Sequence, residues 1–451
     1  MMSTRSEEWL KMTAEKDLRA YLDKLRKAGE LFHIDKNVDP KTEAPALLKM
    51  SVKRGKALFF ESITGSSMKV IGNTLASRDW IEKALGCGNQ SIIEWFSDRS
   101  STNLPAVKVE TAPVKEVVES SINLHKMPIF TYHEEDGGPY ITGGACIQKD
   151  PESGRQNAGY YSLQLKSKDE LALRMLPSAQ GFDIFEKRIN HEKAAEMAVV
   201  IGLHPIEMLA TAAHTHFDEF ELAGALRGEP LELVKCDSID VDVPAHAEII
   251  LEGVIFPDRK EPEGPIGDWL GYYPLVEDRN IFKVQHITTR KNPIYQAILS
   301  GSGDENILLS IPRMADVLKA ARKAASGVKD VSLDPFLMIC IIQMSKRFEG
   351  EPMNAILAAF GEVPFVKICI AVDEDVDLLN MNDVMWAVVT RTRLEEDTNI
   401  IGNLMGFSRD PNRHYKSKLA IDATCPIDSK DDYRRAQVVN PGIDLDSYLA
   451  D

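Results

Sequence analysis

The chain has 451 residues, of which 44% are apolar and 27% are charged, as is typical of a globular protein with two or three domains. Its formal net charge of −16 disfavours binding to nucleic acid or an anionic membrane, although a local basic pocket for an anionic substrate stays compatible with it. No apolar run is long enough to cross a bilayer and the first ten residues hold no apolar signal core, so we predict a cytoplasmic protein. Six cysteines are scattered without a Cys-x-x-Cys pair, which favours neither disulfides nor a cysteine zinc site.

The first part of the chain, 1–112, predicts a small α/β domain. Leu18, Leu22 and Leu25 repeat at the spacing of one helix face. The predicted elements of this domain are a helix at 14–27, strands at 57–60 and 68–71, and a helix at 80–85. A passage with prolines and acids at 115–138 then leads into a different pattern.

The middle of the chain, from about residue 140 to 301, is mostly β-rich with short interruptions. The predicted elements are strands at 160–165, 198–202, 232–236, 247–256, 282–288 and 294–299, and one helix at 219–226. Short strands at this spacing, with few long helices between them, favour a barrel-like sheet over a doubly wound one. We therefore place a β-barrel domain at 113–303.

After residue 303, helices and strands alternate again, which predicts a C-terminal α/β domain over 304–451. The predicted elements are a helix at 314–325, a strand at 336–342, a helix at 353–359, a strand at 366–372 and a helix at 383–392. No internal repeat or low-complexity linker separates the three parts, so we expect them to pack closely. The predicted fold class is a multidomain α+β and α/β protein.

Two carboxylates, Glu263 and Asp268, lie five residues apart in the segment 260–273, which also carries three aromatic residues. Because its prolines remove backbone donors and its glycines permit tight turns, we expect a loop of fixed shape that is neither helix nor strand. Paired carboxylates in a partly apolar pocket take different pKa values, so one can donate a proton while the other accepts. The alternative is a turn-rich surface loop whose acids have no such role.

Several segments together resemble the UbiD family, decarboxylases that use prenylated flavin mononucleotide (FMN). The first is the acidic loop itself, Glu-Gly-Pro-Ile-Gly-Asp at 263–268, followed by Gly-Tyr-Tyr. The others lie, in the family's order, at 219–236, 243–253, 293–301, 372–387 and 417–424. The resemblance covers about residues 15 to 426. It implies an N-terminal α/β domain, a central split β-barrel that binds flavin, and a C-terminal α/β domain that forms oligomer contacts.

The resemblance implies a reversible decarboxylase or carboxylase that acts on an aromatic or α,β-unsaturated acid. The prenylated FMN is the electron sink, Mn²⁺ or another divalent metal and K⁺ bridge its phosphate to the protein, and a flavin prenyltransferase supplies it. The implied assembly is a homodimer or homohexamer. By the same resemblance, Glu263 is expected to donate the proton to the product carbon, and Asp268 to tune or relay it.

The resemblance also supplies metal ligands. Asn157 and Glu219 match the family's metal-binding residues, and carboxylate and amide oxygens suit a hard cation. Without the resemblance, Glu219 would be taken as an acid that favours a helix start. The residues predicted to bind the cofactor are Asn157, Ala158, Tyr161, Ser162, Gln180, Glu219 and Lys418.

One departure from the family concerns an arginine. The stretch Asn-Ala-Gly-Tyr-Tyr-Ser at 157–162 ends in Ser162, where the family has an arginine that engages flavin and substrate carboxylate and pairs with the loop glutamate. Serine supplies neither charge nor a bidentate fork, although we keep Ser162 among the predicted catalytic residues. Because side chains alternate along a strand, neither Arg155 nor Arg174 is expected to replace the missing arginine.

A second departure is the family's metal-binding histidine, which is missing; Ser178 or Gln180 would offer weaker oxygen ligands, and Ser178 is kept in the predicted metal site. His214 and His216, near Glu219, either compensate for it or lie in a polar loop before a helix, which we favour. Lys418 either reaches the flavin phosphate or is an exposed lysine at a strand start.

These departures leave three hypotheses open. The first is a working enzyme with an unusual substrate, such as a CoA thioester or a phosphorylated aromatic acid. The second is a subunit of a multi-subunit carboxylase of the phenylphosphate or aromatic-hydrocarbon type. The third is a non-catalytic paralogue that keeps the fold for binding or assembly.

Overall fold

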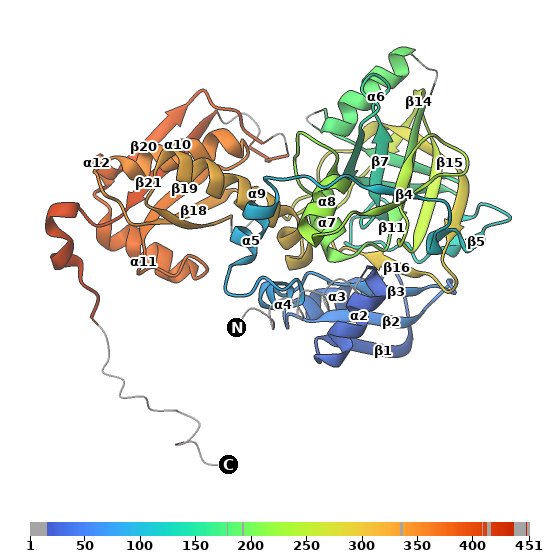
Figure 1. The fold of residues 1–451 in the computed structure, drawn as a ribbon, viewed down its shortest axis with the longest axis horizontal. Coiled ribbons are helices and arrows are strands. Elements are labelled where there is room, and N and C mark those ends of the chain that lie inside the picture. The colour runs from blue at the N-terminus through green and yellow to red at the C-terminus, as the bar shows by residue number, and fades with distance from the viewer. Residues whose placement is uncertain are drawn as a thin grey trace. The chain divides into compact units, whose positions relative to one another are not determined.

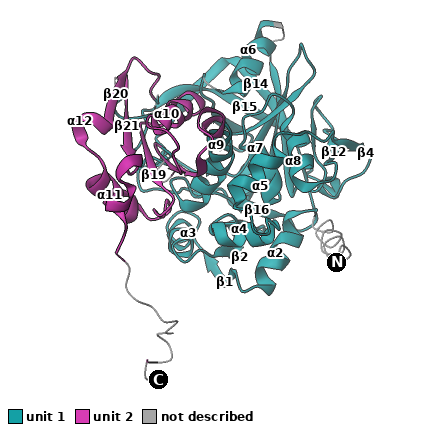
Figure 2. Ribbon diagram, turned by 60° about the vertical axis from the view of Figure 1, so that its left-hand side comes forward, with its two compact units in different colours: residues 1–319, 335–337, 407–414 teal, residues 320–334, 338–406, 415–451 magenta. Residues whose placement is uncertain are grey.

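The computed structural model describes residues 16–177, 179–191, 194–333, 337–407, 409–412, 416–436 and 448. The chain divides into two compact units (Figure 2). The first comprises 1–319 with 335–337 and 407–414, and the second comprises 320–334, 338–406 and 415–451. The division falls inside helix α9 (Gly303–Ala324). Within the described ranges, no helix combines the length and the apolar character needed to cross a membrane.

The N-terminal part of the first unit is a four-stranded sheet flanked by helices, drawn mostly in blue in Figure 1. Its strands, in spatial order, are β1 (Leu31–Val38), β2 (Ala57–Ile63), β3 (Lys69–Gly72) and β16 (Ile294–Ala297). Its helices are α2 (Leu18–Lys27), α3 (Ala44–Val52), α4 (Arg78–Ala84) and α5 (Ile92–Arg99). The buried face of α2 carries Leu18, Leu22 and Leu25, so the predicted helix face is confirmed. Helices α3 and α5 are not among the predicted elements.

A nine-stranded antiparallel sheet forms the centre of the first unit and curls into a half-barrel, so the predicted barrel-like architecture is confirmed (Figure 1). In spatial order, its strands are β6 (Tyr140–Ile141), β9 (Ser162–Ser167), β10 (Glu170–Arg174), β15 (Glu277–Thr289), β14 (Ile249–Glu263), β11 (Ala195–Ile201), β7 (Ala145–Lys149) and β8 (Gln156–Tyr160), with β5 (Val117–Val118) beside β15. The smaller elements around it are helices α6 (Gln180–His191), α7 (Pro205–Thr211) and α8 (Glu219–Arg227) and strands β4 (Val107–Val109), β12 (Glu232–Lys235) and β13 (Asp242–Pro244).

Strand β14 corrects one expectation from the sequence. Residues 260–263, which were expected to be loop, belong to this strand and pair with β15, with Pro262 opposite Asp278. The partner strand on the other side, β11, pairs with β14 only as far as Ile255. Beyond that point one side of β14 is an edge, where a strand tolerates proline. The loop therefore begins at Gly264, and Glu263 is held by a strand.

The second unit contains a five-stranded sheet with helices. Its strands, in spatial order, are β17 (Val328–Ser332), β18 (Ile339–Met344), β19 (Ile368–Asp373), β21 (Ser417–Ala423) and β20 (Thr398–Gly402). Its helices include α10 (Glu351–Glu362), α11 (Met381–Arg391) and α12 (Leu394–Asp397). The predicted alternation of helix and strand is confirmed. The strand expected at 336–342 begins at Ile339, and residue 336 lies outside the described residues.

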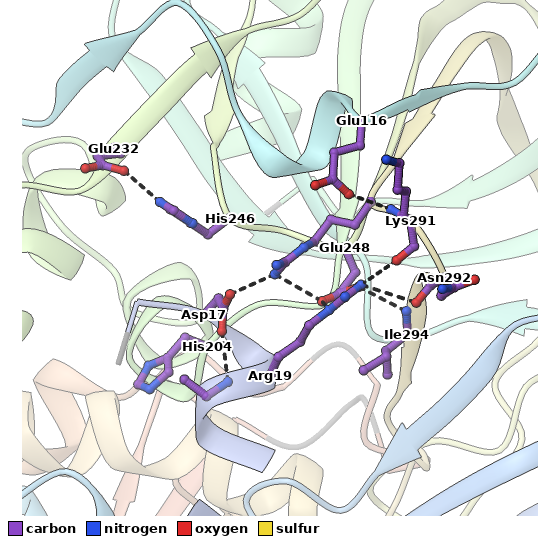
Figure 3. Close-up of polar contacts among 12 residues, drawn as sticks. Asp17, Arg19, Glu116, His204, Glu232, His246, Glu248, Lys291, Asn292 and Ile294 are labelled. Carbon is purple, nitrogen blue, oxygen red and sulfur yellow. Dashed lines mark hydrogen bonds and ion pairs between the residues drawn. The ribbon is translucent and has the colours of Figure 1, made fainter. Parts of the chain in front are cut away.

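An ion network attaches helix α2 to the central sheet. Arg19 donates from Nε and Nη2 to the two carboxylate oxygens of Glu248, each at 2.7 Å, and Glu248 is fully buried (Figure 3). Glu248 also accepts from the backbone N–H of Ile294 at 3.1 Å, at the start of β16. Arg290 donates to Asp17, the N-cap of α2, at 2.8 Å. The N-terminal helix and sheet are therefore fixed to the half-barrel by charge as well as by packing.

Candidate active site

Glu263, the last residue of β14, is fully buried and both of its carboxylate oxygens accept hydrogen bonds. Arg174 at the end of β10 donates from Nη1 to Oε2 at 2.9 Å, and the Tyr140 hydroxyl donates to Oε1 at 2.9 Å. Burial and the neighbouring Glu263 charge raise the pKa of Tyr140, so its hydroxyl remains a donor. Glu263 is thus held in one orientation by a cation and a hydroxyl.

Arg174 brings a guanidinium to Glu263, although the sequence led us to expect that neither Arg155 nor Arg174 would stand in for an arginine at position 162. Strands β9 and β10 are antiparallel, and their register puts Arg174 directly opposite Ser162. Residues directly opposite in an antiparallel pair project on the same face, with Cβ atoms about 4.5–5.5 Å apart. The alternation rule relates positions within one strand, and it does not apply across the β9–β10 turn.

Asp268, the second acid of the loop, lies in a different environment. Its side chain is buried, and Oδ1 accepts from the backbone N–H of Leu270 at 3.0 Å. The other oxygen, Oδ2, has no hydrogen-bond partner among the described residues. Burial raises the pKa of Asp268, against the opposing effect of the Arg409 charge. The two loop acids therefore differ: each oxygen of Glu263 accepts a hydrogen bond, and the buried Oδ2 of Asp268 accepts none from a described residue.

Arg409 is a site residue that the sequence did not indicate. It comes from 407–414, a short segment near the C-terminus that belongs to the first unit. The ring of Phe407 packs on that of Trp269, with centroids 5.2 Å apart. Within the described part of the chain, Nε of Arg409 finds no hydrogen-bond acceptor, and its charge acts on Asp268 and Glu305. No local motif marks Arg409, because its segment and the acidic loop that it approaches are about 140 residues apart in the sequence.

The segment 132–138 clamps the acidic loop. The carboxylate of Asp136 accepts from the backbone N–H groups of Tyr132, His133 and Gly267, at 3.0, 2.9 and 2.8 Å. Gly137 donates to the carbonyl of Pro265 at 2.8 Å. A Cβ atom at Gly137 would lie 2.1 Å from the Gly264 carbonyl oxygen, so only glycine permits this approach. The loop has the fixed shape that the sequence predicts.

A second cluster contains four of the predicted cofactor and metal residues. The amide nitrogen of Asn157 lies 3.1 Å from Oε1 of Gln180 and 3.1 Å from Oε1 of Glu219, and Ala158 N–H donates to Glu219 Oε2 at 2.9 Å. Burial raises the pKa of Glu219 to about 7. In the chain as described, no lysine, arginine or histidine forms a salt bridge with Glu219.

This donor set fits a hard divalent cation such as Mn²⁺ or Mg²⁺. Glu219 is a buried carboxylate without a counter-ion, and the amide oxygens of Asn157 and Gln180 are suitable further ligands. Oxygen and nitrogen of a side-chain amide exchange places by a 180° turn, so Asn157 can present Oδ1 instead of its nitrogen. Ser178, the other predicted ligand, lies outside the described residues.

The remaining predicted residues fall in different places. Tyr161 follows β8, and its hydroxyl lies 2.6 Å from where a Cβ of Gly181 would be, at the start of α6. His214 and His216 lie in the loop before α8, and the carbonyl of Thr215 between them accepts from Nε2 of Gln180 at 3.3 Å, so both alternatives for these histidines stay predictions. Lys418 belongs to the second unit, is 2% exposed, and donates to the carbonyl of Pro364 at 2.7 Å. The alternative of an exposed lysine is therefore wrong, and the contact of Lys418 with the flavin phosphate stays a prediction.

Comparisons with known proteins agree over most of the chain. Family models of the 3-octaprenyl-4-hydroxybenzoate carboxy-lyase (UbiD) match residues 22–100 as the N-terminal domain, 106–303 as the Rift-related domain and 306–423 as the C-terminal domain. A protein of Methanosarcina mazei named anhydromevalonate phosphate decarboxylase is 34% identical over 425 residues, which cover 93% of this chain and 98% of that one. A protein of the same name from Methanothermobacter thermautotrophicus is 28% identical over 93% of this chain and 99% of its own length.

Solved structures extend the similarity to the fold. The UbiD-class enzyme HmfF from Pelotomaculum thermopropionicum, in complex with FMN, superposes with a TM-score of 0.91 at 35% identity, covering 96% of this chain and 100% of that one. An evolved dimeric form of HmfF in complex with prFMN gives a TM-score of 0.88 at 33% identity, with 96% and 100% covered. The vanillic acid decarboxylase of Sedimentibacter hydroxybenzoicus gives 0.85 at 28% identity, with 96% and 97% covered.

Proposed function

Because the chain belongs to the UbiD family of carboxy-lyases, we propose that it decarboxylates an α,β-unsaturated acid that carries a phosphate, with prenylated FMN as cofactor. The two relatives named anhydromevalonate phosphate decarboxylase support this substrate class, since the name describes an acid that has lost water and bears a phosphate. The HmfF structures with FMN and prFMN support the cofactor. Among the substrates expected from the sequence, a phosphorylated acid is thus favoured over a CoA thioester and over an aromatic acid.

The buried Arg174–Glu263 pair beside Asp268 is the observation that carries the proposal. Burying two charges costs desolvation energy that a fold alone does not require. Unpaired polar atoms and shifted pKa values next to such a pair are typical of functional sites. Arg174 brings to Glu263 the guanidinium that Ser162 lacks, which weakens one of the two reasons to expect a non-catalytic paralogue or a dependent subunit. The missing metal-binding histidine is the other reason, and we favour a working decarboxylase.

The contacts support exchanging the roles expected for the two acids. Prenylated FMN, when bound, would supply an electron sink for the pair released as the bond between the carboxylate carbon and the α-carbon breaks and CO₂ leaves. The product carbon then needs a proton, and Asp268 is suited to donate it because its pKa is raised and Oδ2 is unoccupied. Glu263 orients Arg174, whose guanidinium receives the substrate carboxylate.

We place the metal at the second cluster. Glu219, Asn157 and Gln180 would hold a divalent ion that neutralises the flavin phosphate, and the raised pKa of Glu219 is what a buried carboxylate shows before a cation pairs with it. The backbone N–H of Ala158 keeps the carboxylate oriented toward Asn157. Substituting Glu219 should therefore abolish metal binding and leave the contacts of the acidic loop unchanged.

The test is turnover by the flavin-loaded protein. It would be co-produced with a flavin prenyltransferase, purified without oxygen, and supplied with anhydromevalonate phosphate while CO₂ release is measured. Asp268→Asn is expected to lower turnover by about 10²–10⁴-fold, the usual contribution of a general acid, without loss of bound flavin. Asp268→Glu should restore part of the rate, since it returns the acid.

Two results would change this proposal in different ways. A full rate in Asp268→Asn would return the proton-donor role to Glu263 and leave the reaction class intact. No CO₂ release by flavin-loaded wild-type protein, from this phosphate or from a panel of aromatic and α,β-unsaturated acids, would refute the proposed function. The hypothesis of a dependent subunit would then be tested by searching for a partner chain.

The expected homo-oligomer remains part of the proposal. The exposed apolar side chains of the second unit include Met385 and Val389, one turn apart on α11, and Ile400 on β20, which are 45%, 77% and 79% exposed. Since β20 is an edge strand and these side chains are exposed, the second unit offers apolar positions suited to association with another chain. Val389→Glu should convert the oligomer to a smaller species in light scattering.

A further inference from the structure

A cavity of about 720 Å³ lies in the first unit, next to the acidic loop. Its walls come from helix α3, from the segment around Tyr132 and His133, and from 299–303 at the start of α9. The cavity is large enough for a small acid with a polar tail. The roles derived so far for the loop acids and the metal cluster do not involve its lining.

The charge of this cavity is opposite to that of the whole chain. Three lysines line it, Lys41, Lys49 and Lys53, against one acid, Glu134, in a protein of net charge −16. None of the three forms a salt bridge with a described residue. Nearby lysines outside the cavity behave differently: Lys56 pairs with Glu30 at 2.7 Å, and Lys69 pairs with Glu61 at 2.6 Å.

Two of these lysines are placed together on one helix face. Lys49 lies in the last turn of α3 and Lys53 is its C-cap, so they are four residues apart and adjacent on the helix surface. Like charges at this spacing repel each other by about 0.2–0.5 kcal/mol. An anion bound between them would remove that repulsion and form an ion pair with each ammonium.

The opposite wall is formed by the start of the 22-residue helix α9, with Ser300, Ser302 and Gly303 in the lining. Glu305, in the first turn of α9, accepts from the Gly301 N–H at 2.6 Å and from the Ser300 hydroxyl at 3.3 Å, and the Ser302 N–H donates to the Leu299 carbonyl. The positive charge of the cavity therefore comes from the lysines, and the start of α9 closes its opposite side.

The cavity wall also touches the catalytic loop. The ring of His133 contacts Gly267, where a Cβ would lie 2.6 Å from Nδ1. Gly301 contacts Asp268, whose carbonyl oxygen would lie 3.0 Å from a Cβ at Gly301. A substrate whose carboxylate binds Arg174 next to the loop can extend from there into this cavity.

We propose that Lys49 and Lys53, with the start of α9, form the subsite that binds the phosphate of the substrate. This inference rests on the proposed function, because it assigns the part of the substrate that does not react. The ligand chemistry is a phosphate monoester. A phosphate bound here, away from the reacting bond, selects for the phosphorylated acid and positions its carboxylate.

Steady-state kinetics with paired substrates test the subsite. The double variant Lys49→Gln with Lys53→Gln should raise KM for anhydromevalonate phosphate by at least about tenfold, as expected for lost charged hydrogen bonds, with kcat unchanged. KM for the same acid without its phosphate should not change. The control is Lys36→Gln, an exposed lysine on β1 that does not line the cavity. Equal KM values in wild type and double variant would overturn the inference and leave the proposed function intact.

A binding measurement separates the failure of this subsite from the failure of the reaction. Calorimetry with propyl phosphate, a small monoester, needs no turnover, and its affinity should fall in the double variant and not in Lys36→Gln. If wild-type protein releases no CO₂ but still binds propyl phosphate through these lysines, the subsite stands and the proposed function fails. Coenzyme A carries phosphates too; binding of coenzyme A through Lys49 and Lys53 without binding of propyl phosphate would overturn the monoester assignment.

Discussion

Replacing Arg174 by glutamine removes the cation that pairs with Glu263 and leaves a carboxylate buried without its charge partner. The side chains of Arg174 and Glu263 are 5% and 0% exposed, so water does not screen the pair. Removing one partner of a buried ion pair costs about 3–5 kcal/mol, because the remaining charge has no compensation. We therefore expect the free energy of unfolding to fall by that amount, and turnover to be lost with it.

Urea unfolding of the purified protein measures the first effect and CO₂ release measures the second. The matched control is Arg259→Gln, which breaks another Arg–Glu pair of the same sheet, with Nη2 of Arg259 2.8 Å from Oε2 of Glu170. Arg259 is 47% exposed, and a solvent-exposed pair contributes only about 0–1 kcal/mol. The control should unfold close to wild type and keep its activity.

Two results with Arg174→Gln would contradict these expectations. If Arg174→Gln and Arg259→Gln unfold at the same urea concentration, burial does not increase the contribution of the Arg174–Glu263 pair to the free energy of unfolding. If Arg174→Gln is stable but also retains turnover, the guanidinium does not receive the substrate carboxylate. Turnover lost without loss of stability would assign Arg174 to substrate binding alone.

The metal cluster, the acidic loop and the Arg19–Glu248 ion pair each lead to a further prediction. Glu219→Gln should abolish Mn²⁺ binding in calorimetry, and in wild type the Mn²⁺ affinity should fall as pH drops below about 7, because protons then compete for the carboxylate whose pKa burial raises to about 7. Turnover should fall as pH rises through the raised pKa of Asp268, since the donor loses its proton, and Asp268→Asn should show no such limb at any residual rate. Glu248→Ala should lower the free energy of unfolding by about 1.5–3 kcal/mol in urea, the value of hydrogen bonds to charged groups, because Arg19 stays about a third exposed (34%) and keeps water.

Local patterns in the sequence predict local structure well in this chain. The leucine spacing of α2 and the short apolar strands of the half-barrel depend on which face of each element is buried. The spacing of apolar residues within one segment is enough to predict that face. The segment 263–268 could be recognised because its glycines, proline and acids are adjacent in sequence. Pro262 misled the prediction. A strand tolerates a proline at an edge, and β14 has an edge there only because its pairing with β11 ends at Ile255.

Long-range contacts set the parts of the site that the sequence could not predict. Arg174 reaches Glu263 because β10 returns beside β9, and Arg409 reaches Asp268 from a segment near the C-terminus. Lys418 was open to the alternative of an exposed lysine, but it is 2% exposed and donates to the Pro364 carbonyl. The charges are visible in the sequence, but their partners depend on strand order and packing.

Position 162 illustrates how far a family motif constrains a site. The guanidinium must reach Glu263, and two positions offer that reach because Ser162 and Arg174 are cross-strand neighbours with Cβ atoms about 4.5–5.5 Å apart. An arginine side chain is long enough to span this difference. The exchange variant Ser162→Arg with Arg174→Ser should therefore recover part of the turnover and stability that Arg174→Ser alone loses.

Coupling between the two positions is what the exchange measures. If the positions are equivalent, the double variant is more active and more stable than the sum of the two single variants predicts. Ser162→Arg alone should not improve on wild type, because a second guanidinium beside Arg174 repels it and finds no free oxygen on Glu263. Strict additivity in the double-mutant cycle would show that the motif position itself, and not the charge delivered to Glu263, determines the chemistry.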